Sequence, residues 1–167
     1  MSSPRVPMEF PERFNMAWYF LDRNVEEGRG EKECLYYRDE AYTYREVQAR
    51  ANRFGNALRA LGVDVEDRVL LVLPDRPEFA FAWFGAAKAG AVVAMVNPLL
   101  PADDFVHYFE YSRARVAVVD ESTLDRIDAL RDIDTIEDLR AEWPRLEPLL
   151  APSPGLAAAV RAALGGA

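Results

Sequence analysis

The stretch Gly85–Leu100, GAAKAGAVVAMVNPLL, decides how this chain folds. Small residues at helical spacing lead to Gly90, an apolar run follows, and Asn97-Pro98 stops it. A phosphate-binding loop needs successive backbone N–H groups that converge at the start of a helix, with glycines that allow close approach. Here the glycines end a helix and precede a strand, where the exposed groups are carbonyls. The stretch therefore predicts a joint, in which Gly90 caps a helix and Ala91–Val96 form a core strand.

The flanking sequence repeats this alternation of helix and strand. Apolar residues spaced three and four apart predict helices, and continuous apolar runs predict strands that are covered on both faces. Such an alternation implies an α/β fold: a parallel sheet of at least three strands with right-handed crossovers and flanking helices. The predicted elements are helices over 44–61, 77–89 and 101–114 and strands over 69–73, 91–96 and 115–122.

Signals at the ends of these helices support the assignment. Thr43 and Glu46 stand three residues apart, as in a capping box, and Gly62 suits the position just past the end of the first of these helices. The helix over 77–89 is expected to pack on the sheet and to bury Phe84 there.

The N-terminal part is predicted to add a helix and a hairpin. Over 14–24 the apolar spacing of an amphipathic helix is present, and the aromatic residues 18–20 are expected to anchor it to the body. A polar loop is expected over 25–33. Two short β-favouring runs over 34–44 flank Arg-Asp-Glu and predict a hairpin.

The character of the chain changes after Asp120. Residues 120–147 hold ten acidic residues and four arginines, and the following residues are rich first in proline and then in alanine. A solvated helix face explains these acids better than a metal cluster. We therefore predict an N-terminal arm over 1–12, an α/β subdomain over 13–123, and a helical tail over 124–167.

Composition excludes several classes of function. The net charge of −8 makes nucleic acid and anionic membranes poor partners. Cys34 is the one cysteine, so an internal disulfide is excluded. No apolar run approaches the ~20 residues that span a bilayer, and the N-terminus lacks the apolar segment of a signal peptide. A cytoplasmic, soluble protein is expected.

Four polar residues are candidates for a functional site. Lys88 falls in the last turn of a helix, where a cation suits the helix dipole, and His107 lies among aromatic residues with no partner at catalytic spacing. Cys34 has no second cysteine for zinc. Asp75 is the best placed, because it follows the carboxyl end of a strand, where ligands bind in open α/β sheets. A structural role is favoured for each, so no catalytic, cofactor-binding or metal-binding residue is assigned.

Five segments in order resemble the N-terminal part of the adenylate-forming acyl-CoA ligases, and most closely the benzoate-CoA ligase branch. They are FNMAWYFLDRN, GNALRALGV, DRVLLVLPDRPEF, FGAAKAGAVVAMVNPLL and YSRARVAVVDES. The resemblance covers about residues 13–124. It implies the first subdomain of such a ligase, an acid–thiol ligase that uses ATP, Mg²⁺ and coenzyme A, with the KAG element as part of the scaffold.

The sequence departs from this family after the resemblance ends. The Ser/Thr/Gly-rich phosphate loop, the Tyr-Gly-x-Thr-Glu adenine segment, the ribose-binding Asp and the catalytic Lys have no counterpart in these residues. The expectation is a truncated ligase homologue that is inactive alone. The alternatives are an assembly partner of a ligase and one half of a split ligase. An uncovered apolar surface is expected to promote self-association or binding to a ligase.

Overall fold

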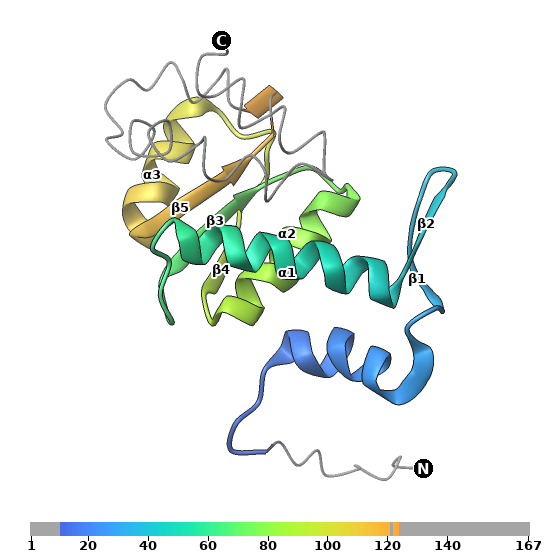
Figure 1. The fold of residues 1–167 in the computed structure, drawn as a ribbon. Helices are drawn as coiled ribbons and strands as arrows, with labels where there is room; N and C mark the ends of the chain where they lie inside the picture. Colours follow the sequence, from blue (N-terminus) through green and yellow to red (C-terminus); the bar gives the residue numbers. More distant parts are fainter. Residues whose placement is uncertain (1–10, 121, 124–167) are drawn as a thin grey trace, which may run out of the picture.

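The computed structural model describes residues 11–120 and 122–123, which form a three-stranded parallel sheet with helices on both faces and a separate hairpin (Figure 1). This confirms the predicted α/β class. Two short π-helical segments come first, followed by three α-helices and five strands. The elements are η1 Trp18–Asp22, η2 Val25–Arg29, β1 Glu33–Tyr37, β2 Glu40–Thr43, α1 Tyr44–Ala60, β3 Arg68–Val72, α2 Pro77–Ala89, β4 Val92–Met95, α3 Ala102–Ser112 and β5 Ala114–Val119.

The sheet has the order β4-β3-β5, and both pairs are parallel. Its central strand β3 carries the continuous apolar run Val69–Val72, all of it buried. The two faces of β3 belong to two different cores. Val69 and Leu71 pack with residues of α1 and α2, whereas Leu70 and Val72 pack with Phe105 of α3. A strand without polar residues was expected to be covered on both faces, and this is the case.

The joint predicted at Gly90 is present. Gly90 has a φ of 85°, in the left-handed region that favours glycine, and its N–H donates to the Ala87 carbonyl at 3.1 Å. The N–H of Ala91 donates to the Ala86 carbonyl at 3.0 Å, so the last turn of α2 is closed before β4 begins.

The strand after this joint is not a core strand, contrary to the prediction. β4 lies at the end of the sheet, and the side chains of Val92 and Met95 are exposed. An apolar run without charges fits a covered strand and an uncovered edge equally well, because local sequence does not specify how many neighbours a strand has.

Both ends of α1 follow the sequence signals. The hydroxyl of Thr43 accepts from the Glu46 N–H at 3.2 Å, and the Glu46 carboxylate accepts from the Thr43 N–H at 2.8 Å. This is the predicted capping box. At the other end, Gly62 has a φ of 76° and ends the helix as expected.

The predicted hairpin is also present. β1 and β2 pair antiparallel and are joined at Arg38, which has a positive φ of 52°. Figure 1 shows the hairpin projecting from the body beyond the start of α1.

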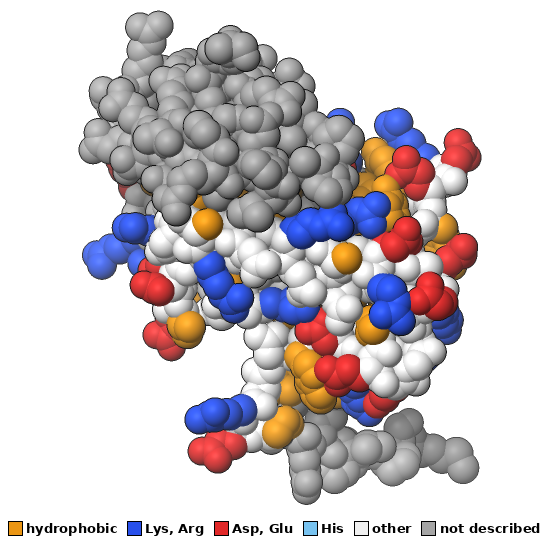
Figure 2. Space-filling model, viewed as in Figure 1, with side chains coloured by type: hydrophobic (Ala, Val, Ile, Leu, Met, Phe, Trp, Pro, Cys, Tyr) orange, Lys and Arg blue, Asp and Glu red, His pale blue; other side chains and the backbone are white. Residues whose placement is uncertain are grey.

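One expectation for the N-terminal segment holds only in part, and another is wrong. Helical turns extend into the predicted polar loop, where the Arg23 and Arg29 guanidinium groups both bind the Glu27 carboxylate, but Gly28, with a φ of 84°, interrupts them and residues 30–32 are not helical. The aromatic residues 18–20 are exposed rather than anchoring, because the buried contacts are made by Ala17 and Leu21. Figure 2 shows hydrophobic side chains gathered on this segment, while charges of both signs are interspersed over the rest of the face.

The remaining differences concern element ends and one buried residue. Arg113 adopts a left-handed conformation, which ends α3 at Ser112 and starts β5 at Ala114. The Asp120 carboxylate accepts from the Thr123 N–H at 3.0 Å, and this turn ends the strand before the predicted residue 122. Phe84 is only half-buried, and it packs toward η1 and α1 rather than onto the sheet.

Two predictions extend past the described residues. The arm over 1–12 is described only at its last two residues, and the tail over 124–167 lies outside the described residues. In the part of the chain that is described, no helix is both long enough and apolar enough to cross a membrane.

Candidate functional site

The carboxyl edge of the sheet is the first candidate site. Asp75 lies there in the loop between β3 and α2, as predicted, and its side chain is exposed. β3 has parallel neighbours on both sides, and the helices that follow β3 and β4 cover opposite faces. This is the point where the strand order reverses, at which open α/β sheets bind ligands.

Asp120 is the one carboxylate at this edge with a perturbed titration among the described residues. Its partial burial acts to raise the pKa, but hydrogen bonds from Thr123 and Ser122, with the positive charge of Arg76, outweigh this effect and lower it. Both carboxylate oxygens are engaged, because the Ser122 hydroxyl donates to Oδ2 at 2.8 Å and the Thr123 N–H to Oδ1. Asp120 therefore serves to close a turn.

The starts of α1 and α2 do not fit the phosphates of a nucleotide. The first residue of α2 is Pro77, which has no N–H, and Glu78 adds a negative charge to its first turn. The start of α1 is already occupied by its capping box. Within residues 11–120 and 122–123, no group of three or more His, Cys, Asp or Glu side chains could hold a metal ion.

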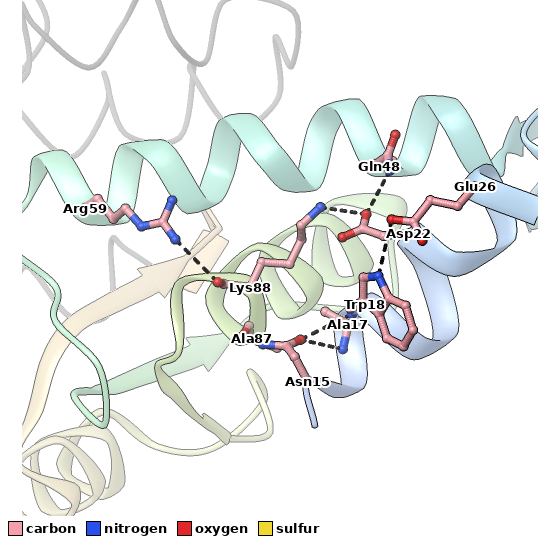
Figure 3. A network of polar contacts seen from close by, with 9 residues as sticks. All are labelled: Asn15, Ala17, Trp18, Asp22, Glu26, Gln48, Arg59, Ala87 and Lys88. Atoms are coloured by element: carbon pink, nitrogen blue, oxygen red, sulfur yellow. Dashed lines mark hydrogen bonds and ion pairs between the residues drawn. The ribbon is translucent and has the colours of Figure 1, made fainter. Parts of the chain in front are cut away.

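Lys88 lies elsewhere, in a polar network between α2, α1 and the N-terminal helical segment (Figure 3). Its ammonium contacts the Asp22 carboxylate at 2.7 Å, and the two side chains are only 20% and 14% exposed. The Gln48 amide donates to the same carboxylate oxygen at 2.9 Å. The Lys88 ammonium is therefore paired with a carboxylate inside the structure.

Asn15, at the start of the same helical segment, also connects the segment to α2. The side-chain oxygen Oδ1 of Asn15 accepts from the N–H groups of Ala17 and Trp18, and its side-chain amide donates to the Ala87 carbonyl at 2.8 Å (Figure 3). The network thus holds the start and the middle of the segment against the end of α2. Sequence reasoning missed both partners, because they come from positions more than 60 residues before Lys88.

His107 and Cys34 are not brought to either site. His107 is exposed on α3 and stacks on the ring of Tyr111, four residues later, at 5.8 Å between ring centroids. Cys34 is half-buried beside the cluster of α1 and η1, and burial, with the charge of Glu46, raises the pKa of its thiol. A raised thiol pKa opposes nucleophilic chemistry.

A third cluster was not predicted. The Arg50 guanidinium lies over the rings of Tyr42 and Phe81, at 5.0 and 5.4 Å from their centroids. A hydrogen bond to the Glu40 carboxylate raises the pKa of Tyr42 to about 12. The phenol therefore stays protonated at neutral pH, and the cluster fastens the hairpin to α1 and α2 rather than offering a reactive group.

Comparisons with known proteins show which family this chain resembles. The family of AMP-binding enzymes matches residues 21–155. A benzoate–CoA ligase of Thauera aromatica is 42% identical over 120 residues, which are 70% of this chain and 22% of that protein. A 4-hydroxybenzoate–CoA/benzoate–CoA ligase of Rhodopseudomonas palustris is 36% identical over 146 residues, 83% of this chain and 27% of that protein.

The fold is shared as well. A benzoate CoA ligase from Burkholderia xenovorans superposes with a TM-score of 0.67 at 35% identity, over 72% of this chain and 24% of that one. The chain therefore spans about a quarter of the length of the proteins it matches.

Proposed function

Because the chain belongs to the AMP-binding enzyme family, we propose that its described residues form the scaffold at the beginning of an ATP-dependent aryl-CoA ligase. Such a ligase activates a benzoate-like carboxylate as an acyl-adenylate and transfers the acyl group to coenzyme A. In this proposal the scaffold supplies no catalytic group of its own, and the 167 residues alone do not adenylate benzoate.

The observation that carries the proposal is that two charged groups, Lys88 and Asp120, are paired inside the structure. Lys88 is neutralised by Asp22, and the oxygens of Asp120 are engaged by its own turn. The similarity to aryl-CoA ligases over this same segment supports the aryl carboxylate as the substrate class.

ATP, Mg²⁺ and coenzyme A would then bind to residues outside those described. The helix starts of α1 and α2 offer no free cluster of N–H groups for a phosphate, and the sequence contains no Gly-Lys-Ser/Thr motif. Transition-state stabilisation in adenylate formation depends on positioned donors and cations, which this scaffold does not provide.

A chimera tests the proposal directly. Residues 13–123 would replace the matched segment of the Thauera aromatica benzoate–CoA ligase, and benzoate-dependent exchange of pyrophosphate into ATP would be measured. We expect the chimera to retain exchange, whereas the 167-residue chain alone should give only the blank rate. A folded chimera without exchange, or exchange by the chain alone, would overturn the proposal.

A second candidate is one half of a split ligase, or an assembly partner. It is favoured because the described part has an ordered interior of its own: α1 begins at a capping box, α2 ends at the left-handed Gly90, and no buried side-chain polar atom in this part lacks a hydrogen-bond partner. The chain would be mixed with the remaining three quarters of the Thauera aromatica enzyme. Restored exchange supports the split enzyme, binding without exchange supports the assembly partner, and no binding rejects both.

A further inference from the structure

Among residues 11–120 and 122–123, β4 ends the sheet, and the backbone groups on its outer side have no partner strand. The N–H groups of Val92 and Val96 donate to the carbonyls of Asp67 and Leu71, at 2.8 and 2.9 Å, so the even-numbered residues of the strand face β3. Residues alternate along a parallel strand in the neighbour they face. The N–H and C=O groups of Val93 and Met95 therefore point away from the sheet.

The residues of β4 itself carry none of the side chains that usually protect an edge against pairing. Exposed edges are generally guarded by charged side chains, proline or a bulge. Residues 90–96 contain neither a charged residue nor a proline, and Val92 and Met95 are 49% and 60% exposed. At the opposite end of the sheet, β5 carries an exposed arginine, Arg115, within the strand, and a second, Arg113, directly precedes it.

We propose that β4 is a self-association surface, on which a second copy of this chain pairs antiparallel across a two-fold axis at Ala94. In this register Val93 of one copy lies opposite Met95 of the other, and these outward-facing residues exchange hydrogen bonds in both directions. The result is a continuous six-stranded sheet that is shared by two chains.

The side chains of β4 fit a copy of the same strand. Ala94 of one copy lies opposite Ala94 of the other in a non-hydrogen-bonded pair. The Cα atoms of such a pair are only about 4.5 Å apart, so a small side chain fits there. Val92 lies opposite Val96, so apolar groups meet apolar groups. β4 has no charged side chain, so the pairing brings no like charges together, as would oppose it. An isologous contact of this kind closes on itself and forms a dimer rather than a fibre.

Sedimentation velocity over a concentration series tests the surface. We expect the 167-residue chain to shift from monomer to dimer as its concentration rises. The Met95→Lys variant should stay monomeric, because a charge on the edge blocks pairing. The control is Tyr36→Lys, which adds the same charge at an exposed apolar residue of the hairpin and should dimerise like the wild type. A monomeric wild-type chain, or a Met95→Lys variant that dimerises equally, would overturn the proposal.

Cysteine cross-linking tests the register. In a Cys34→Ser background, two copies of Ala94→Cys would face each other within the Cα separation of about 4.4–6.8 Å that a disulfide allows. Two copies of Val92→Cys would lie about 13 Å apart along the strands. Oxidised glutathione should therefore link the 94 variant much faster. Equal rates would reject this register, and association that requires a ligase fragment would assign the edge to a different occupant.

Discussion

Gly55 of α1 and Gly85 of α2 touch where the two helices cross: a Cβ placed on Gly55 would lie 2.9 Å from the Gly85 carbonyl oxygen. A Cβ on Gly85 would lie 2.7 Å from the Ala51 carbonyl oxygen and 2.9 Å from the Gly55 nitrogen. These are backbone atoms of a helix, which cannot move aside as the end of a side chain can. Glycine at both positions therefore lets α1 lie close enough to α2 for Phe54 and Ala82 to share one core.

Gly85→Ala should lower the stability of the protein. Alanine gains about 1 kcal/mol of helix propensity over glycine, but overpacking a closed contact costs about 1–3 kcal/mol, and here it separates two helices. We expect the urea midpoint of unfolding to fall. Asn56→Gly compared with Asn56→Ala, at an exposed residue inside α1, measures the propensity effect without a close contact. A higher midpoint for Gly85→Ala would show that the helices can separate at no cost.

The ion pair between Lys88 and Asp22 should contribute more than the surface pairs. Removing one partner of a fully buried pair costs about 3–5 kcal/mol, and this pair is slightly exposed, so we expect about 1–3 kcal/mol for Lys88→Met. Glu31→Gln, which breaks an exposed pair with Arg45, should cost less than about 1 kcal/mol. Urea unfolding of both variants, with Asp22→Asn to complete a double-mutant cycle for the Lys88 pair, measures the difference. Equal losses would contradict the burial seen here.

Phe81 is a core residue of α2, whereas Phe84, which was expected to be buried, is not. Phe81 is buried with Leu21 and Val47, whereas Phe84 is half-buried at the margin of this cluster. Truncation of a buried phenylalanine to alanine costs about 3–5 kcal/mol. We expect this for Phe81→Ala and a clearly smaller loss for Phe84→Ala, both measured by denaturant unfolding. The reverse order would favour the packing predicted from the sequence.

Features encoded within a few residues were predictable from the sequence. The capping box of Thr43 and Glu46, the left-handed Gly90 and the apolar strand β3 each depend on neighbours within about five positions, and each was found. Features that depend on distant segments were not. Nothing near β4 indicates that it ends the sheet, and spacing alone could not show that Ala17 and Leu21 face inward while Trp18 and Phe20 face out.

At the candidate sites, too, local features were predictable from the sequence and distant partners were not. Asp75 was placed correctly at the carboxyl end of β3, because the end of an apolar run marks the end of a strand. Lys88 was expected to have a structural role, and its partner Asp22, which lies 66 residues away, carries no local signal in the sequence. Tertiary partners of this kind follow only from the packing of η1 against α1 and α2.

Stability should fall in acid partly through the capping box of α1. Hydrogen bonds from the backbone and the hydroxyl of Thr43 lower the pKa of Glu46 below its usual value of 4.5. Because the folded pKa is below the unfolded one, this carboxylate stabilises the fold above about pH 4.5, and the contribution is lost as the pH falls through the folded pKa. Glu46→Gln keeps an acceptor for the Thr43 N–H but cannot titrate. Urea unfolding at a series of pH values should therefore give a shallower acid limb for Glu46→Gln than for the wild type. Parallel curves would mean that Glu46 titrates alike in the folded and unfolded chains.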